Sequence, residues 1–310
     1  MLRGSLTLFL LLSALSARSN ATDELIARLK RDYPPALKRL EAAYGRSKGL
    51  GTITTSQVTG SNAKFKVVFA ADQGCRKLVL SPVTAEPGRD SISEHVYCIG
   101  RELAFEVKKK LNSAYFLVDL QNDVDFAAFP EKFTASFIAP ISIDGIPMSL
   151  TMGMLDSVVG AEEVIVAEKK LIRVDFKLPV EPEGYSIGFE AVTFDPDLDW
   201  AIRKTESRHE QKDTPLSITK VEYGPKRDGI PILKKVTMND ALTGVTVFEA
   251  ESVTFEPVPS SEFTLDHYGL TTPQMEPLRQ TGWGMRPWFV AAAALVTLVV
   301  FLAWRAIRAR

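Results

Sequence analysis

The sequence predicts a mainly β protein of the α+β class. We expect a large curved antiparallel sheet, or half-barrel, covered by N-terminal and central helices and followed by one C-terminal transmembrane helix. Beyond about residue 51, apolar residues alternate with polar ones at a period of two, as in strands with one face in water. Turn residues such as Asp228-Gly229 join these segments, and such short connections favour antiparallel neighbours.

The N-terminus has the features of an export signal. A positive charge at Arg3 precedes the apolar run Leu6–Leu15, which is too short to span a bilayer. Small residues suited to cleavage follow between Ser16 and Ala21. We therefore predict that residues 1–20 are a signal peptide.

Helical periodicity follows the signal peptide. Thr22 can cap a helix that carries acidic residues in its first turn, and Pro34 is expected to end it. Pro35 suits the first position of a second helix, which runs to Tyr44. The sequence predicts a loop over Gly45–Gly51.

Roughly a dozen segments show the β pattern, and turn residues separate many of them. They lie at residues 64–67, 76–81, 95–99, 103–107, 114–120, 162–167, 172–178, 187–194, 199–206, 216–223, 230–238 and 245–256. Sequential strands with short connections predict a meander, because parallel strands need long crossovers.

One stretch, Phe126–Val159, interrupts the strand pattern. It is apolar, contains prolines and is rich in methionine, with Met148, Met152 and Met154 close together. We interpret it as one or two short helices or a loop that covers the concave face of an open sheet. Methionines can line an adaptable apolar cavity, although filler in an ordinary core is their commoner use.

The C-terminus predicts a membrane anchor. Residues 271–287 have no strand or helix period and form a stalk, and residues 288–304 contain no charge and carry a tryptophan at each end. Their length meets the lower limit of ~17 residues for a membrane helix. The basic tail 305–310 should stay in the cytoplasm, so the ectodomain 21–270 should lie in the periplasm or another extracytoplasmic space. A buried core helix and a cleaved sorting signal are the alternatives.

Two cysteines, Cys75 and Cys98, stand in strand-like runs of the exported part. If these runs pair as a hairpin centred near Pro87, the two positions come nearly opposite one another. A disulfide is then geometrically feasible, since extracytoplasmic compartments often permit one. Two buried thiols are the equal alternative.

No motif predicts an enzyme. Gly45-Arg46-Ser47-Lys48-Gly49 matches the nucleophile elbow of hydrolases, which needs a strand before the serine and a helix after it. Here a helix is predicted before the serine and a loop after it. Only His95, His209 and His267 could serve as the base, so a hydrolase is the low-ranking alternative.

Metal, cofactor and nucleic-acid sites are not indicated either. Asp195, Asp197, Asp199 and Glu206 follow a calcium-loop spacing, but Trp200 stands where that loop needs glycine, so calcium is a weak alternative. We expect no cofactor. The chain has 37 basic and 38 acidic residues, and this balance offers no electrostatic basis for nucleic-acid binding.

Two turn regions carry a family resemblance. Val192–Pro196 leads into Trp200–Lys204, and Glu222–Gly224 leads into Asp228–Ile232. With the order of parts along the chain, these hairpins resemble the LolA-like lipoprotein-carrier superfamily over residues 50–256, here as a membrane-tethered variant. The resemblance implies an unclosed, strongly curved sheet whose apolar concave face is covered by helices and holds acyl chains or contacts envelope components.

These observations predict a non-catalytic, membrane-anchored binding or sensing domain for an apolar ligand, such as a lipid or a lipoprotein acyl chain. We expect the ligand cavity to be lined by Phe65, Phe105, Phe176 and Phe189 and covered by Met148, Met152 and Met154. The alternative is a structural or protein-interaction domain of the envelope that has a solid core and binds another envelope protein.

Overall fold

The computed structural model describes residues 3–83, 91–101, 103–121, 139–143, 146–147, 152–176, 188–208 and 215–272. The chain divides into two compact units, Met1–Leu270 and Thr271–Arg310. Only the first unit is described below, and the predicted membrane segment at residues 288–304 lies outside the described residues. Of residues 3–20 the structure describes the backbone alone.

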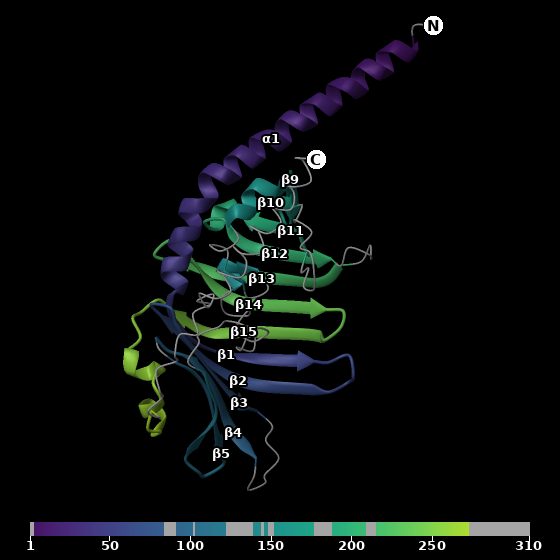
Figure 1. The fold of residues 1–310 in the computed structure, drawn as a ribbon. Helices are drawn as coiled ribbons and strands as arrows, with labels where there is room; N and C mark the ends of the chain where they lie inside the picture. The colour runs from purple at the N-terminus through teal and green to yellow at the C-terminus, as the bar shows by residue number, and fades with distance from the viewer. Residues whose placement is uncertain are drawn as a thin grey trace, which may run out of the picture. The chain divides into compact units, whose positions relative to one another are not determined.

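A single helix, α1 (Arg3–Tyr44), opens the fold (Figure 1). The prediction that Pro34 ends one helix and Pro35 starts another is wrong, because both prolines lie inside α1. Proline removes a hydrogen bond and disturbs the preceding turn. Burial on both sides of the pair offsets this cost, since Tyr33 and Leu37 are both almost fully buried.

The predicted loop at Gly45–Gly51 is also wrong, because these residues belong largely to strand β1 (Arg46–Ser56). The glycines serve close packing here. A Cβ at Gly49 would lie 2.5 Å from the Phe69 ring, and one at Gly51 would lie 2.7 Å from the Phe248 ring. Glycine in a strand marks such an approach as well as a turn.

The other strands of the large sheet are β2 (Asn62–Asp72), β3 (Cys75–Pro82), β4 (Ile92–Ile99), β5 (Ala104–Lys110), β6 (Tyr115–Gln121), β9 (Val158–Val166), β10 (Lys169–Phe176), β11 (Gly188–Asp195), β12 (Ala201–Arg208), β13 (Pro215–Arg227), β14 (Ile230–Asp240) and β15 (Gly244–Thr254). The 13 strands lie in the order β6-β5-β4-β3-β2-β1-β15-β14-β13-β12-β11-β10-β9. All neighbours are antiparallel. The prediction of a mainly β fold with one large antiparallel sheet is confirmed, and the sheet is open, with β6 and β9 at its ends.

Short elements follow β6 in the predicted insert. The described parts are the 3-10 helices η2 (Ala139–Ile141) and η3 (Met152–Ser157) and a two-stranded pair, β7 (Ser142–Ile143) with β8 (Ile146–Pro147). η2 contacts α1 and β12, and its three residues are buried. This part of the insert therefore helps α1 to cover the sheet.

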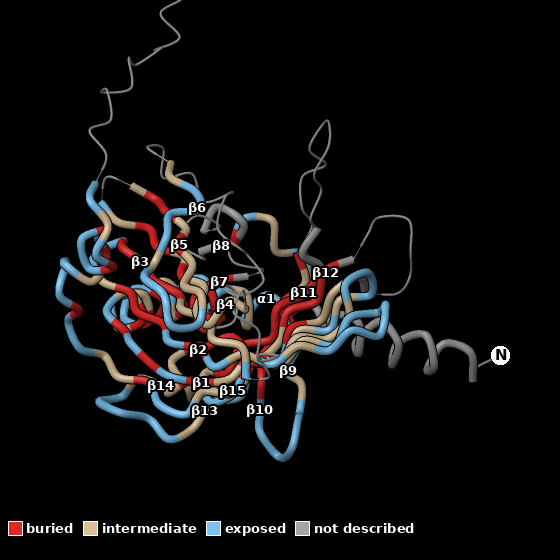
Figure 2. The backbone as a smooth tube through the Cα atoms, turned by 90° about the horizontal axis from the view of Figure 1, so that it is seen from below, coloured by how far each residue is buried: buried red, intermediate tan, exposed pale blue. Residues whose placement is uncertain are grey.

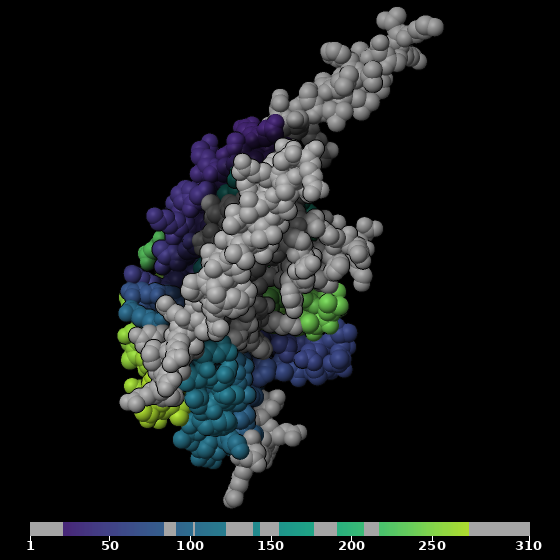
Figure 3. All heavy atoms as spheres, viewed as in Figure 1, coloured from purple at the N-terminus to yellow at the C-terminus, as the bar shows by residue number. Residues whose placement is uncertain are grey.

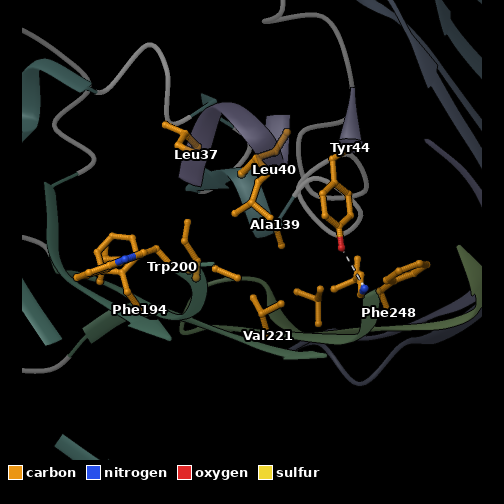
Figure 4. Packing of buried hydrophobic residues seen from close by; sticks show 14 of the residues in the cluster. Leu37, Leu40, Tyr44, Ala139, Phe194, Trp200, Val221 and Phe248 are labelled. Carbon is orange, nitrogen blue, oxygen red and sulfur yellow. Dashed lines mark hydrogen bonds between the residues drawn. The ribbon is translucent and has the colours of Figure 1, made fainter. Parts of the chain in front are cut away.

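The main core lies between α1 and the face of the sheet that α1 contacts, which we call the inner face. From α1 it receives Leu29, Tyr33, Leu37, Leu40 and Tyr44. Figure 4 shows Leu37, Leu40 and Tyr44 above Val221 and Phe248 of the sheet, with Ala139 of η2 beside the helix. Figure 2 shows the buried segments along β11 and β12 and the exposed hairpin turns.

A second core lies on the opposite side of the sheet, the outer face, over strands β2 to β6. The segment after β15 forms two 3-10 helices, η5 (Ser260–Phe263) and η6 (Leu265–Tyr268), and buries Phe263, Leu265 and Tyr268 against Val96 and Phe105. In Figure 3 this yellow-green segment lies beside the blue-green strands. Strands β2 to β5 thus contribute buried side chains on both faces.

Candidate functional site

An apolar row crosses the inner face at the centre of the sheet. The strand registers form a row of five residues on adjacent strands, in which each residue lies opposite the next: Val221, Val236, Phe248, Ile53 and Phe65. The first four are buried, whereas Phe65 is only half-buried. The apolar row therefore continues past the part of the inner face that is fully covered.

Several other apolar side chains at the border of the main core are also only half-buried. They are Tyr97, Tyr223, Ile230, Ile232, Met238, Ala250 and Phe255. Half-burial leaves apolar surface in water, and covering that surface is favourable by about 25 cal/mol per Å². This border can contact an apolar ligand, so we treat the inner face around Phe65 as the candidate ligand-binding face.

Two of the predicted cavity residues lie on this face. Phe65 and Phe176 both pack into the main core, Phe176 as a buried residue. Phe105 does not join them, and its placement in the same cavity is wrong. It lies on the outer face, with its ring 5.9 Å from the ring of Tyr268. Side chains alternate between the two faces along a strand, so Phe105 faces outward because its neighbours Ala104 and Glu106 lie on the inner face.

The remaining predicted cavity residues stay predictions. Phe189 lies in β11, and Met152 and Met154 lie in η3, but the structure does not describe these three side chains. Met148 lies outside the described residues.

A polar cluster adjoins the apolar row on the same face. We define it as His95, Tyr97, Glu106 and Lys108, which come from the adjacent strands β4 and β5. The Nε2 atom of His95 lies 2.7 Å from Oε1 of Glu106, and the Tyr97 hydroxyl lies 3.1 Å from Nδ1 of His95. Lys108 Nζ reaches the same Glu106 oxygen at 3.0 Å.

The electrostatics of the polar cluster favour a neutral histidine. Burial lowers the pKa of His95, against the opposing effect of Glu106. Neutral imidazole has one donor nitrogen and one acceptor nitrogen. Nε2–H then donates to Glu106 while Nδ1 accepts from the Tyr97 hydroxyl, and burial, with Glu106 adding to it, raises the pKa of Tyr97 to about 12.

The polar cluster is not apparent from the sequence, because His95 is isolated from Glu106 and Lys108 along the chain. The alternation of side chains along the strands did contain a hint of the polar cluster. His95 and Tyr97 are two residues apart and therefore lie on the same face of one strand, as do Glu106 and Lys108 on the next. A hairpin between the two strands brings the pairs together. Only the register shows that His95 lies opposite Lys108 and Tyr97 opposite Glu106.

The serine of the elbow-like sequence is not placed for nucleophilic attack. Ser47 is buried in β1, and its hydroxyl donates to the carbonyl oxygen of Tyr44 at 2.8 Å. Helix α1 comes before it and a strand contains it, which is the reverse of the order that a nucleophile elbow requires.

The carboxylates of the weak calcium alternative do not converge. Three of them pair with cations: Asp195 with Arg203, Asp199 with Arg39, and Glu206 with Arg173 and Lys204. Burial acts to raise the pKa of Glu206, but the hydrogen bonds and charges of Lys204 and Arg173 outweigh it and lower the pKa. Within the described ranges, no group of three or more His, Cys, Asp or Glu residues could hold a metal ion.

The two cysteines are close but not opposite. Both are free and buried, and the register of β3 and β4 places Lys77, not Cys75, opposite Cys98. Cys75 lies two residues further along the same face, because the hairpin pairs Arg76 with Ile99. A disulfide between them stays a prediction. A pocket of about 220 Å³ lies beside Cys75, lined by Asp72, Gln73, Arg101, Val258, Ser260 and Phe263.

Within the part of the chain that the structure describes, no helix is both long enough and apolar enough to cross a membrane.

Comparisons with known proteins give structural neighbours only. No family model matches the sequence, and no curated protein matches it. A DUF1329 family protein from Desulfovibrio piger is similar at 12% identity and a TM-score of 0.43, over 77% of this chain and 98% of that chain. A domain named for outer membrane lipoprotein sorting, from Vibrio parahaemolyticus, has 9% identity and a TM-score of 0.41, over 77% of this chain and 97% of that chain. A LolA superfamily protein from Nitrosomonas europaea has 12% identity and a TM-score of 0.39, over 75% of this chain and 98% of that chain.

Proposed function

We propose that the protein is a non-catalytic binding or sensing protein of the cell envelope, which holds an apolar ligand against the inner face of its open sheet. The ligand is a lipid or the acyl chain of a lipoprotein. One observation supports this most directly: the apolar row runs from the buried Val221 to the half-buried Phe65 across five strands without a polar interruption. Apolar surface left partly open on an inner face suits a long aliphatic ligand.

The energetics of such a site require no reactive group. Burial of an aliphatic chain contributes about 0.8 kcal/mol per methylene. A chain of ten methylenes therefore contributes on the order of 8 kcal/mol, from which the loss of translational and conformational freedom is subtracted. Micromolar affinity corresponds to about 8.2 kcal/mol of net binding free energy, so a longer chain or polar contacts must supply what ten methylenes lack.

The cellular placement in this proposal comes from the sequence. A signal peptide at residues 1–20 and a membrane helix at residues 288–304 would leave the described domain in the periplasm, with the basic tail 305–310 in the cytoplasm. Protease added to cells with a permeabilised outer membrane should then digest the domain and leave a protected C-terminal fragment. Full protection of residues 21–270 would contradict this topology.

Lipid carried by the purified full chain tests the binding function. We expect mass spectrometry of an organic extract of the wild-type protein to detect lipid, in an amount that rises in proportion to the amount of protein extracted. Phe65→Glu should lose most of it, because a carboxylate at the border of the apolar row repels an acyl chain. Val68→Glu is the matched control, since Val68 lies on the same strand with an exposed side chain that points to the outer face.

Two results would oppose the proposal. One is a wild-type protein that is always free of lipid, and the other is an equal lipid content in the Phe65 and Val68 variants. Thermal unfolding of both variants verifies that each is folded when its lipid is measured.

A second candidate function, a protein-interaction domain with a solid core, is favoured by one observation. Strand β6 lies at an end of the sheet and exposes Phe116, Leu117 and Val118. An apolar strand at a sheet edge can pair with a strand of another protein. Affinity capture from detergent-solubilised membranes should then recover one protein with the wild type and lose it with Val118→Lys. Lipid extraction from the same samples separates the two functions.

A further inference from the structure

We propose that the polar cluster is the head-group end of the ligand-binding face. It would select an amphiphile whose head carries an anionic oxygen beside a hydrogen-bond donor, as phosphoethanolamine and phosphoglycerol heads do. This inference rests on the proposed function, and it adds the chemical class of the ligand and the orientation in which it binds.

The register places the polar cluster on the same face as the apolar row. Leu80 of the main core lies opposite His95, which lies opposite Lys108. Leu78 of the main core lies opposite Tyr97 in the same way. Directly opposed residues of antiparallel strands point to one side of the sheet. At this level of the sheet the face is therefore apolar on β3, at Leu78 and Leu80, and polar on β4 and β5.

The separation suits a single amphiphilic molecule. Neighbouring strands are about 4.8 Å apart, so β5 lies on the order of 14 Å from β2, the strand that carries Phe65. A lipid whose head contacts Lys108 on β5 can thus lay its acyl chain along the apolar row.

The hydrogen-bonding capacity of the polar cluster is only partly used. Lys108 has three donors, and one of them reaches Glu106. Both described contacts of Glu106 use Oε1, which leaves Oε2 as an acceptor for a ligand. The Lys108 and Glu106 side chains are 28% and 24% exposed, so water or a ligand can reach both.

Among the described residues, charges of both signs stand beside the polar cluster, which argues against a lone anion or a lone cation as the ligand. Asp119 of β6 lies opposite Glu106, and Lys110 lies two residues beyond Lys108 on the same side of β5. Burial lowers the pKa of His95 and so favours its neutral form. A head group with both an anionic oxygen and a donor matches a surface of mixed charge better than a head with one charge.

Native mass spectrometry of the full chain in detergent tests the assignment with four added probes. These are oleoyl lysophosphatidylethanolamine, oleoyl lysophosphatidylcholine, monoolein, and glycerophosphoethanolamine, which lacks an acyl chain. We expect the ethanolamine lysolipid to bind several-fold more tightly than the choline lysolipid, whose head has no donor. Glycerophosphoethanolamine should not bind at concentrations that saturate the lysolipid. If it bound as tightly as the lysolipid, the assignment to an amphiphilic ligand would be overturned and the polar cluster would be a site for a free phosphate compound.

Variants of β5 identify the residue that contacts the head. Lys108→Met should weaken both lysophospholipids at least tenfold, since it removes a charged hydrogen-bond donor, and should leave monoolein unchanged. Lys108→Arg should restore binding. Lys109→Met is the matched control. Lys109 is the next residue on the same strand, so its side chain points to the outer face, where it lies over the Tyr115 ring.

The outcomes separate the two levels of the proposal. If monoolein and the lysolipids bind but Lys108→Met and Lys109→Met behave alike, the head-group assignment is wrong and the apolar function stands. If none of the acyl probes binds to the wild type, both are wrong.

Discussion

At the scale of single residues, the position of a residue in the alternation along its strand decides whether its side chain faces the candidate ligand. Phe105 and Glu106 are neighbours in the chain, yet Phe105 packs under Tyr268 on the outer face while Glu106 joins His95 on the inner face. A shift of one residue in the β4–β5 register would exchange them. Binding specificity in this fold therefore depends on register as much as on residue type.

His95 makes the stability of the protein depend on pH. Its folded-state pKa is lowered by burial, so the unfolded chain binds the proton more readily than the folded one. Stability should be constant well above the unfolded pKa of about 6.5 and should fall as the pH drops below that value. Urea unfolding at pH 7.5 and pH 5.5 measures the difference, which should shrink in His95→Gln.

The control for this prediction is His267→Gln, because His267 is exposed beside Tyr268. The stability of the His267→Gln variant should depend on pH in the same way as that of the wild type. An equal loss of stability at low pH in the wild type and in His95→Gln would contradict a role for His95.

Gly51 should tolerate no side chain. An added Cβ would lie 2.5 Å from the carbonyl oxygen of Glu249 and 2.7 Å from the Phe248 ring, both fixed in the centre of the sheet. Gly51→Ala is expected to lower the free energy of unfolding by about 1–3 kcal/mol through overpacking. At Gly224, where a Cβ meets only the Ile232 carbonyl oxygen at 3.8 Å, alanine should have little effect in the same denaturant titration.

At the scale of elements, the C-terminal end of α1 is held on the sheet by one buried tyrosine. The Tyr44 hydroxyl donates to the carbonyl oxygen of Pro231 at 2.8 Å and accepts from the Leu233 N–H at 3.0 Å (Figure 4). Both partners belong to β14, so the contact joins the first element of the fold to a strand far along the chain. It fixes how far along the inner face α1 extends.

Removal of this hydroxyl should therefore be costly. Tyr44→Phe leaves a buried N–H and a buried carbonyl without their partner, and we expect a loss of about 1–3 kcal/mol in chemical denaturation. Tyr33 gives a matched control on the same helix, because its buried hydroxyl has no hydrogen-bond partner among the described residues. Tyr33→Phe should leave stability unchanged or raise it, and equal losses in the two variants would contradict this account.

At the scale of the whole described domain, the open sheet has two unequal coverings. Helix α1 and η2 cover the inner face, while the segment after β15 covers the outer face of β2 to β6. The outer cover includes the ion pair of Lys77 with Glu262 and the hydrogen bond that the Val258 N–H donates to the Asp72 carboxylate. The inner cover leaves the border around Phe65 half-buried, and for that reason we propose the inner face as the binding face.

Ligand binding should then stabilise the whole domain. A lysolipid present at one hundred times its dissociation constant should add about 2.7 kcal/mol to the free energy of unfolding, because it binds the folded state alone. Differential scanning calorimetry of the delipidated full chain, with and without lysophosphatidylethanolamine, measures this as a rise in the unfolding temperature. Phe65→Glu should show a smaller rise, and Val68→Glu should respond like the wild type.

Local sequence patterns are enough to predict the fold class and most of the strands, because a period of two and turn residues such as Asp228-Gly229 act locally. It could not place Gly45–Gly51, whose glycines signal a loop until the rings of Phe69 and Phe248 are known to pack over them. Pro34 likewise ends a helix unless tertiary burial holds both sides of it. The tertiary structure alone decided the faces and the registers, and with them the polar cluster, since hydrogen bonding between strands is a long-range property that local periodicity does not contain.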